Sequence, residues 1–172
     1  TMRDMLQKNQ TQIATQKQVL HDKIEELQAA EKKIKESEAY NKVLFSDSGI
    51  ALVVLDPQSG KFTDCNQAAI DIYRMDDKAA LIGLTPVEIS PHIQYDGTPT
   101  PKCVESRIQQ ALKYGSVIFE WRHVHPDGSE CDAEINLMSF RYGNRLLLQF
   151  SARDITESKR IENELVQNER YQ

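Results

Sequence analysis

Two histidines in one predicted strand have the spacing that most directly suggests chemistry. His123 and His125 alternate along the predicted strand 116–125, so both side chains face one side of it, and Cys131 lies across the following hairpin. Imidazole and thiolate are zinc ligands, but this set is short of the four that a structural site needs. Ordinary roles at the surface and in the hairpin are therefore favoured, and no metal site is predicted.

Arg107 is the second candidate for chemistry. It follows Cys103 by four residues on the predicted helix 101–114. A guanidinium there would clamp a carboxylate or a phosphate, whereas on the outer face of the helix it would only be solvated. Trp121, together with His123, would either line a ligand pocket or pack beneath a covering helix. The residue pattern leaves both pairs of alternatives open.

No arrangement typical of a catalytic class accompanies these residues. The sequence contains no phosphate-binding loop, no nucleophile elbow, no HExxH motif and no paired catalytic carboxylates. We therefore predict that the chain is not an enzyme.

Length and composition narrow the class of protein. The 172 residues, with 40% hydrophobic and 27% charged residues, suit one domain with helical extensions. The net charge of -5 argues against a nucleic-acid partner, which would need a basic stripe. No apolar run approaches the ~20 residues of a membrane span, and no signal peptide is visible. The three dispersed cysteines indicate reduced thiols. We expect a cytoplasmic fragment without membrane contact, cut from a longer protein; the sequence leaves open whether that protein is membrane-anchored.

Apolar runs and turn signals predict the order of elements in the globular part. Two strands come first, then three or four short helices, then three strands. The predicted ranges are strands 49–56 and 61–65, helix 67–74, short turns within 76–83 and 85–90, helix 101–114, and strands 116–125, 130–140 and 145–153. This order predicts an α+β fold with a five-stranded antiparallel sheet and helices on one face.

Three local features refine this prediction. Asn66 is expected to cap the helix 67–74. Pro126 before Asp127-Gly128 predicts a type I turn with Gly128 in the left-handed region. Apolar residues in succession at 146–148 place apolar groups on both faces of the last strand, so the second face needs a cover. The segment 37–45 is the available candidate.

The N-terminal segment 1–37 is predicted to be a coiled-coil helix. One apolar position recurs at a strict interval of seven, at Leu6, Ile13, Leu20, Leu27 and Ile34. That interval implies a left-handed supercoil, although the other seam position is mostly polar, which weakens the coil. A parallel two-stranded coil is favoured, and a single solvated helix with i, i+4 ion pairs is the alternative.

Asp154, Ile155 and Thr156 join the last predicted strand to an outgoing helix. Either Asp154 or Thr156 can cap that helix, and Asp154 with Glu157 has the spacing of a capping box. The junction therefore predicts a signal relay from sheet to helix. The predicted division of the chain is 1–37 for the coil, 38–155 for the domain and 156–172 for the signalling helix.

Taken in order, these motifs resemble a PAS domain with its C-terminal PAC motif, a sensory module of bacterial signalling proteins. The resemblance covers about 37–164 and rests on Asn66-Gln67-Ala68-Ala69, Asp127-Gly128 and Asp154-Ile155-Thr156-Glu157. The stretches 88–97 and 119–123 resemble a subgroup found ahead of diguanylate cyclase or histidine kinase domains.

The resemblance implies a pocket between the concave face of the sheet and the long helix. Arg107, Trp121 and His123 are the residues that we expect to bind a ligand or cofactor there, and the resemblance does not identify which one. A flavin adduct is not expected, because 83–88 lacks the cysteine of the light-sensing subgroup. Haem is not expected either, because the helix 101–114 has no histidine.

These patterns together predict a sensory and dimerisation module. It would detect a small-molecule ligand or a partner protein and relay the signal through the coiled-coil helices of a homodimer. The receiver would be an output domain of the diguanylate cyclase or histidine kinase type. The alternative is a ligand-free structural PAS domain that only holds two chains together.

Overall fold

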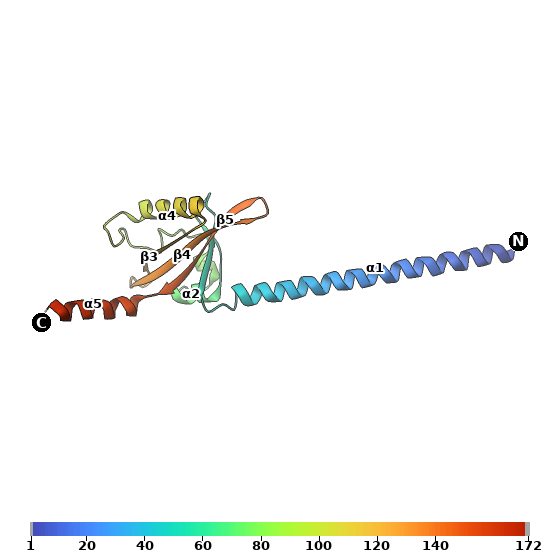
Figure 1. Ribbon diagram of the computed structural model, residues 1–172, viewed down its shortest axis with the longest axis horizontal. Helices are drawn as coiled ribbons and strands as arrows, with labels where there is room; N and C mark the ends of the chain where they lie inside the picture. Colours follow the sequence, from blue (N-terminus) through green and yellow to red (C-terminus); the bar gives the residue numbers. More distant parts are fainter. Residues whose placement is uncertain (1, 171–172) are drawn as a thin grey trace. The chain divides into compact units, whose positions relative to one another are not determined.

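The computed structural model describes residues 2–170 as one long helix and a compact domain (Figure 1). The long helix, α1, runs from Met2 to Phe45, and the chain divides into two units between Leu44 and Phe45. The helix continues past the predicted boundary at residue 37 because residues 2–45 contain no Gly or Pro. It ends where Ser46-Asp47-Ser48-Gly49 introduces turn residues.

The elements of the domain follow the predicted order. They are β1 (Ala51–Leu55), β2 (Phe62–Cys65), α2 (Gln67–Ile72), α3 (Lys78–Leu81), α4 (Thr100–Tyr114), β3 (Ser116–Val124), β4 (Glu130–Tyr142), β5 (Arg145–Asp154) and α5 (Thr156–Arg170).

The five strands form one antiparallel sheet in the order β2-β1-β5-β4-β3, which confirms the predicted α+β fold. β5 is the central strand and pairs with both β1 and β4. Ala51 pairs with Ala152, so β1 begins beside the residues where β5 ends. The chain therefore enters β1 and leaves β5 at the same end of these two neighbouring strands, although 100 residues lie between the two positions in sequence.

The hydrophobic core lies between one face of the sheet and the helices α2, α3 and α4. Alternate strand residues face it, as their two-residue period requires. The strands contribute Val53, Leu55, Ile135, Leu137, Leu148 and Phe150, and the helices contribute Ala69, Ile70, Leu81 and Ala111. The prediction of helices on one face of the sheet is thus confirmed.

The opposite face of the sheet is partly apolar. Leu147 lies on it and is half-buried, whereas the buried Leu148 and the 41% exposed Leu146 lie on the core side of β5. None of the described α1 residues is buried. That the segment 37–45 covers this face stays a prediction.

The five heptad residues of α1 present their side chains to solvent in the single chain. They are all more than half exposed, from 51% for Ile13 to 61% for Leu20. Pairing of two chains through them stays a prediction. None of the described helices has the length and hydropathy that crossing a membrane requires.

The β3–β4 hairpin has the predicted turn. Gly128 has φ 83°, in the left-handed region, and its N–H donates to the carbonyl of His125 at 2.9 Å. The preceding Pro126 fixes its own φ, so glycine takes the position that requires positive φ.

Asn66 ties the entry of the chain to the domain. Its side-chain oxygen accepts from the N–H of Ala69 at 3.1 Å, as the predicted cap of α2, and from the N–H of Leu52 at 2.9 Å. Its amide nitrogen donates to the carbonyls of Phe45 at 2.9 Å and Ile50 at 2.8 Å. One buried amide therefore joins the last residue of α1 to β1 and α2.

Replacing Asn66 by alanine should destabilise the domain strongly. Asn66→Ala removes a helix cap and leaves the partners of five hydrogen bonds without it, which should lower the free energy of unfolding by about 2–4 kcal/mol. Asn66→Asp keeps the two accepting contacts but places a carboxylate against the carbonyls of Phe45, Ser48 and Ile50. Urea unfolding followed by Trp121 fluorescence measures both, with Asn144→Ala in the exposed β4–β5 turn as the control. A cost no larger than that of the control would contradict this role.

Candidate functional site

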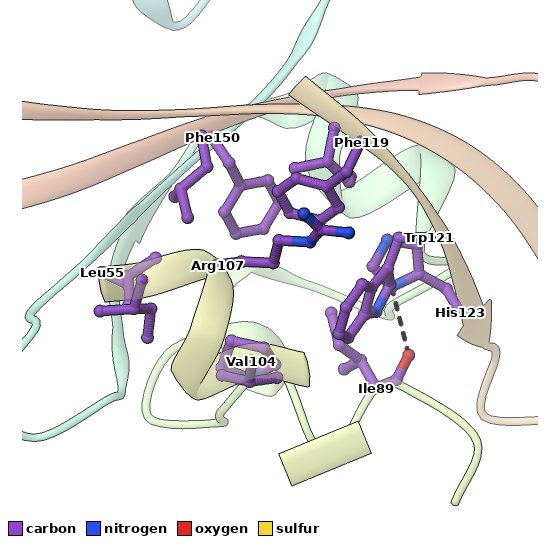
Figure 2. Close-up of a pocket in the computed structure, with 12 residues that line it drawn as sticks. Leu55, Ile89, Val104, Arg107, Phe119, Trp121, His123 and Phe150 are labelled. Carbon is purple, nitrogen blue, oxygen red and sulfur yellow. Dashed lines mark hydrogen bonds between the residues drawn. The ribbon is translucent and has the colours of Figure 1, made fainter. Parts of the chain in front are cut away.

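An apolar cavity lies between α4, the 86–89 turn and the inner face of the sheet (Figure 2). Its walls come from the turn, from α4 and from the inward positions of β1, β3, β4 and β5. It is lined by Leu55, Pro86, Ile89, Val104, Arg107, Ile108, Phe119, Trp121, His123, Ile135, Leu137 and Phe150.

The cavity is small as folded. The space in which the centre of a water molecule can lie is about 40 Å³, within about 420 Å³ of unfilled volume that includes open solvent. About 10–15 Å³ of such space holds one water. The cavity therefore has room for a few waters or a small organic group, and a large cofactor would require its walls to move.

Trp121 occupies the cavity side of the sheet, which settles the face that the sequence left open. The side chain is 5% exposed, and its Nε1–H donates to Ser90 Oγ at 2.8 Å. The Ser90 hydroxyl donates in turn to the Pro86 carbonyl at 2.6 Å. The indole ring meets Phe119 edge to face, with centroids 5.6 Å apart. The 86–90 turn thus fixes Trp121 as a rigid wall.

His123 is a neutral, fully engaged wall residue. It is 3% exposed, its Nδ1 lies 3.3 Å from the Ile89 carbonyl, and its Nε2 lies 3.4 Å from the Tyr73 hydroxyl. A carbonyl can only accept, so Nδ1 carries the proton and Nε2 accepts from Tyr73. Burial lowers the pKa of His123 to about 4.

The zinc-like grouping serves structure. His125 Nδ1 lies 2.8 Å from Ser129 Oγ, and its Nε2 lies 3.0 Å from the Ile72 carbonyl. Burial raises the pKa of the Cys131 thiol to about 11. Among the described side chains, those of residues 2–167, no three of His, Cys, Asp or Glu gather as a metal site would need.

Arg107 reaches the cavity from α4 and does not lie on the outer face of the helix. The side chain is half-buried, and its guanidinium carbon lies 4.8 Å from the centroid of the Phe119 ring. Nη1 donates to Gln110 Oε1 at 3.1 Å. Figure 2 shows the guanidinium against Phe119 and directed toward Trp121 and His123. Arg107, Trp121 and His123 thus line one cavity, and their binding of a ligand stays a prediction.

An outer groove adjoins the cavity and shares Arg107, Phe119 and Trp121 with it. Its other lining residues are Gln94, Tyr95, Asp96, Cys103, Ile118 and Glu120. Burial raises the pKa of Cys103, and its thiol lies 3.9 Å from the Thr98 carbonyl. This thiol is therefore not an activated nucleophile.

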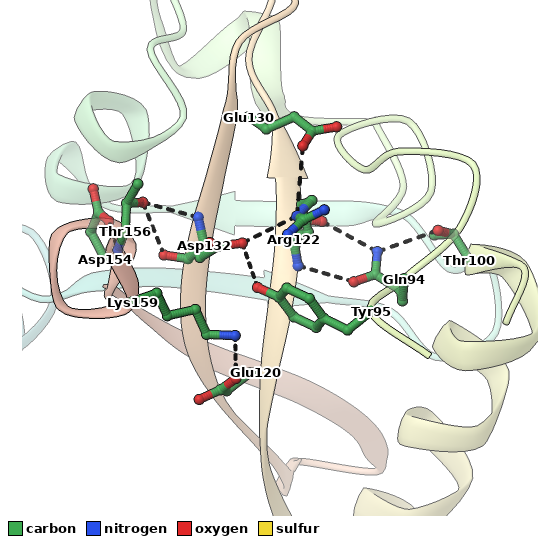
Figure 3. A network of polar contacts seen from close by, with 10 residues as sticks. All are labelled: Gln94, Tyr95, Thr100, Glu120, Arg122, Glu130, Asp132, Asp154, Thr156 and Lys159. Carbon is green, nitrogen blue, oxygen red and sulfur yellow. Dashed lines mark hydrogen bonds and ion pairs between the residues drawn. The ribbon is translucent and has the colours of Figure 1, made fainter. Parts of the chain in front are cut away.

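The junction predicted as a relay is held by Asp132 of β4 (Figure 3). The backbone N–H of Asp132 donates to Thr156 Oγ1 at 3.0 Å, and its carbonyl accepts the Ile155 N–H at 2.8 Å. Asp154 Oδ1 accepts the Thr156 N–H at 2.8 Å. The start of α5 is thus fastened to β4 by Asp154, Ile155 and Thr156, the residues at which β5 gives way to the helix.

Tyr95 extends this junction to the outer groove. Its hydroxyl donates to the carboxylate of Asp132, and burial together with this bond raises the pKa of Tyr95. Lys159 of α5 places its Nζ 3.8 Å from the centroid of the Tyr95 ring and forms an ion pair with Glu120 of β3. Arg122 Nε donates to the same Asp132 carboxylate at 3.2 Å.

Sequence reasoning missed Tyr95, Asp132, Glu120 and Lys159. The predicted turn fixes the register of the β3–β4 hairpin, and this register places Arg122 opposite Asp132. The pair could therefore have been predicted from the sequence. Tyr95 lies in an irregular loop, where no periodicity reports direction. Its place depends on Gln94, whose amide bonds to both the N–H and the carbonyl of Arg122, at 3.0 and 3.2 Å.

The buried state of His123 predicts a pH dependence of stability. Its pKa is lower in the folded than in the unfolded chain, so unfolding takes up a proton between pH 6.5 and about 4. The stability contributed by neutral His123 is complete above pH 6.5 and is lost as the pH falls through this window, by up to about 3 kcal/mol. Urea unfolding of His123→Gln at several pH values should show a flatter profile there, unlike the exposed control His21→Gln. If the free energy of unfolding varied with pH in the same way in both variants, the proposed effect of buried His123 would be contradicted.

Comparisons with known proteins agree with this geometry. The family model described as "PAS fold" matches residues 45–160. The methyl sulfide methyltransferase-associated sensor of Methanosarcina acetivorans is 28% identical over 139 residues, which are 81% of this chain and 13% of that protein. The chain thus spans a small part of this curated relative.

Two solved structures share the fold. The PAS domain of an HTR-like protein from Haloarcula marismortui has a TM-score of 0.62 and 21% identity, covering 74% of this chain and 99% of that one. A PAS domain from Colwellia psychrerythraea has a TM-score of 0.59 and 24% identity, covering 70% and 97%. Since the family model matches more than half of its residues, the chain belongs to the PAS fold family.

Proposed function

We propose that this PAS domain is a sensor whose cavity takes up a small-molecule ligand and whose outgoing helix reports it. The observation that carries the proposal is that the cavity shares wall residues with an outer groove, and that Tyr95, another residue of this groove, contacts the residues at the start of α5. Arg107 and Phe119 belong to the cavity and to the outer groove, and Tyr95 lines the same groove. Tyr95 contacts Asp132 and Lys159, which hold the first turn of α5.

The path supplies a two-state mechanism. A ligand shifts an equilibrium only by its different affinity for the two states. A ligand that moves Phe119 or Arg107 changes the groove wall beside Tyr95. When Tyr95 shifts, the Asp132 carboxylate loses a donor and Lys159 loses its ring contact, so α5 can leave its present seat on β4. The proposed signal is this release or tightening of the first turn of α5.

The receiver in the proposal is an output domain carried by the same protein. Ile161 and Leu165, four residues apart on α5, are 47% and 60% exposed, as a helix that pairs with a second copy requires. With the heptad of α1, they support a homodimer in which the helices carry the signal. We propose a cytoplasmic, non-catalytic module that acts on a diguanylate cyclase or histidine kinase domain. The curated relative from Methanosarcina acetivorans is itself named a sensor.

One observation favours a second function, that of a ligand-free dimerisation spacer. The cavity has only about 40 Å³ open to the centre of a water molecule, and Trp121 and Phe150 fill much of its surroundings. A spacer would keep this cavity closed and would release no small molecule when the purified protein is denatured. Mass spectrometry of the denatured protein separates the two functions.

Removing the Tyr95 hydroxyl should loosen the start of α5. Tyr95→Phe deletes the bond to Asp132 but keeps the ring that Lys159 contacts. Loss of one hydrogen bond of about 1 kcal/mol should speed amide exchange at 155–159 roughly fivefold without lowering global stability by more than that. Hydrogen–deuterium exchange measures this, with Tyr142→Phe, 73% exposed, as the control. Unchanged exchange at 155–159 would contradict the proposed path.

The apolar heptad residues of α1 should determine whether the chain is a dimer or a monomer in solution. Light scattering of the full chain should give twice the 19.7 kDa of one chain. Leu20→Glu with Leu27→Glu places charges in the seam and should give the monomer. Thr11→Glu with Gln18→Glu adds the same charge on the opposite side of the helix and should leave the dimer intact. A wild-type monomer at tens of micromolar would rule out the coil.

A further inference from the structure

The polar groups that line the cavity are already engaged, with one exception. The Trp121 N–H is bonded to Ser90, and both ring nitrogens of His123 have partners. Arg107 is the remaining lining residue with free donors: among the side chains described, those of residues 2–167, its guanidinium makes one hydrogen bond, through Nη1 to Gln110. The same residues provide no carboxylate within ion-pair distance of it.

A half-buried guanidinium without a directly bonded counter-ion is energetically costly. Arginine cannot lose its proton in a protein, so burial cannot neutralise it as it does His123. The Phe119 ring, 4.8 Å from the guanidinium carbon, offers its electron-rich face as a partial substitute. Asp96 lines the outer groove, and hydrogen bonds with Thr98 and, more weakly, the charge of Arg107 lower its pKa. Asp96 is not hydrogen-bonded to Arg107, so it acts on the guanidinium only through space. The fork of donors at Nε and Nη2 therefore suits an anion that comes with the ligand.

From this arrangement we infer that the ligand is a small monocarboxylic acid with a short apolar tail. Its carboxylate would take both oxygens to the Arg107 fork, and its tail would lie among Val104, Ile108, Leu137 and Phe150. This inference rests on the proposed function, since it assigns a chemical class to the same cavity.

Charge favours a carboxylate over a phosphate. One planar guanidinium matches one carboxylate bidentately, whereas a phosphate dianion calls for further cations or N–H donors. The cavity offers none: His123 is neutral and committed to Ile89 and Tyr73, and the Trp121 N–H is held by Ser90. The carboxylate of Asp96, in the adjoining groove, opposes a dianion more than a monoanion.

Size and position complete the inference. The cavity accepts only a short tail, because its free space amounts to a few waters. When the guanidinium turns from the Phe119 ring to a carboxylate, the ring loses its contact in the wall between cavity and outer groove. Tyr95 lines that groove, so the binding of the acid would act on the path to α5.

The test uses the single tryptophan of the chain, Trp121, as a reporter inside the cavity. The full chain is titrated with hexanoate, with its neutral amide hexanamide and with hexyl phosphate, and tryptophan emission is followed. Hexanoate should bind roughly tenfold to hundredfold more tightly than either of the others. Arg107→Gln, which removes the charge but keeps a polar side chain, should abolish this preference. Arg145→Gln, in the exposed β4–β5 hairpin, should retain it.

Each contrary result has a distinct meaning. Equal binding of hexanamide and hexanoate, or an unchanged preference for hexanoate in Arg107→Gln, would contradict the inference that the ligand is a carboxylic acid. It would not contradict the proposed sensor, since the cavity would still bind a ligand. Stronger binding of hexyl phosphate would overturn the choice of carboxylate. If none of the three changes the emission, the inference fails. If the purified protein also releases no small molecule on denaturation, the proposed sensor fails with it. Thermal unfolding checks that both variants remain folded.

Discussion

The structure depends most on how Asp132 holds the point where the chain leaves the sheet. Its backbone receives Ile155 and Thr156, and its carboxylate receives Tyr95 and Arg122. The loop that carries Tyr95, the β3–β4 hairpin and the start of α5 thus meet at one residue. A partly exposed charge network of this kind contributes little stability per bond. It can therefore change partners at low cost, which suits a junction whose position has to respond.

The cavity and the junction are linked because both use β3. Its inward residues, Phe119, Trp121 and His123, form cavity walls, while the outward Glu120 and Arg122 contact Lys159 and Asp132. Successive residues of a strand point to opposite faces, so one strand carries both the cavity walls and the junction contacts. If β3 moves to admit a ligand, the side chains on its other face move with it. In the proposed sensor, electrostatics would supply the selectivity, since Arg107 is the one charged group that the described residues place in the cavity wall.

The sequence predicted those features that short-range rules determine. Strand alternation gave the sheet, the cap at Asn66 gave the start of α2, and Pro126 with Gly128 gave the hairpin turn. The face of Trp121 was not predictable, because Trp121 and its neighbours on both sides could face either way until the covering helices were placed. Tyr95 was missed because its direction depends on a loop held by Gln94 against β3, a long-range contact without a periodic signal.

Amide hydrogen exchange of the wild-type chain, with and without saturating hexanoate, tests the central claim most directly. The account predicts that exchange changes together at 94–98 and at 155–159, the two ends of the path through Asp132, while Trp121 emission reports the filled cavity. A filled cavity with unchanged exchange at 155–159 would contradict it, because the ligand would then be bound without any effect on α5.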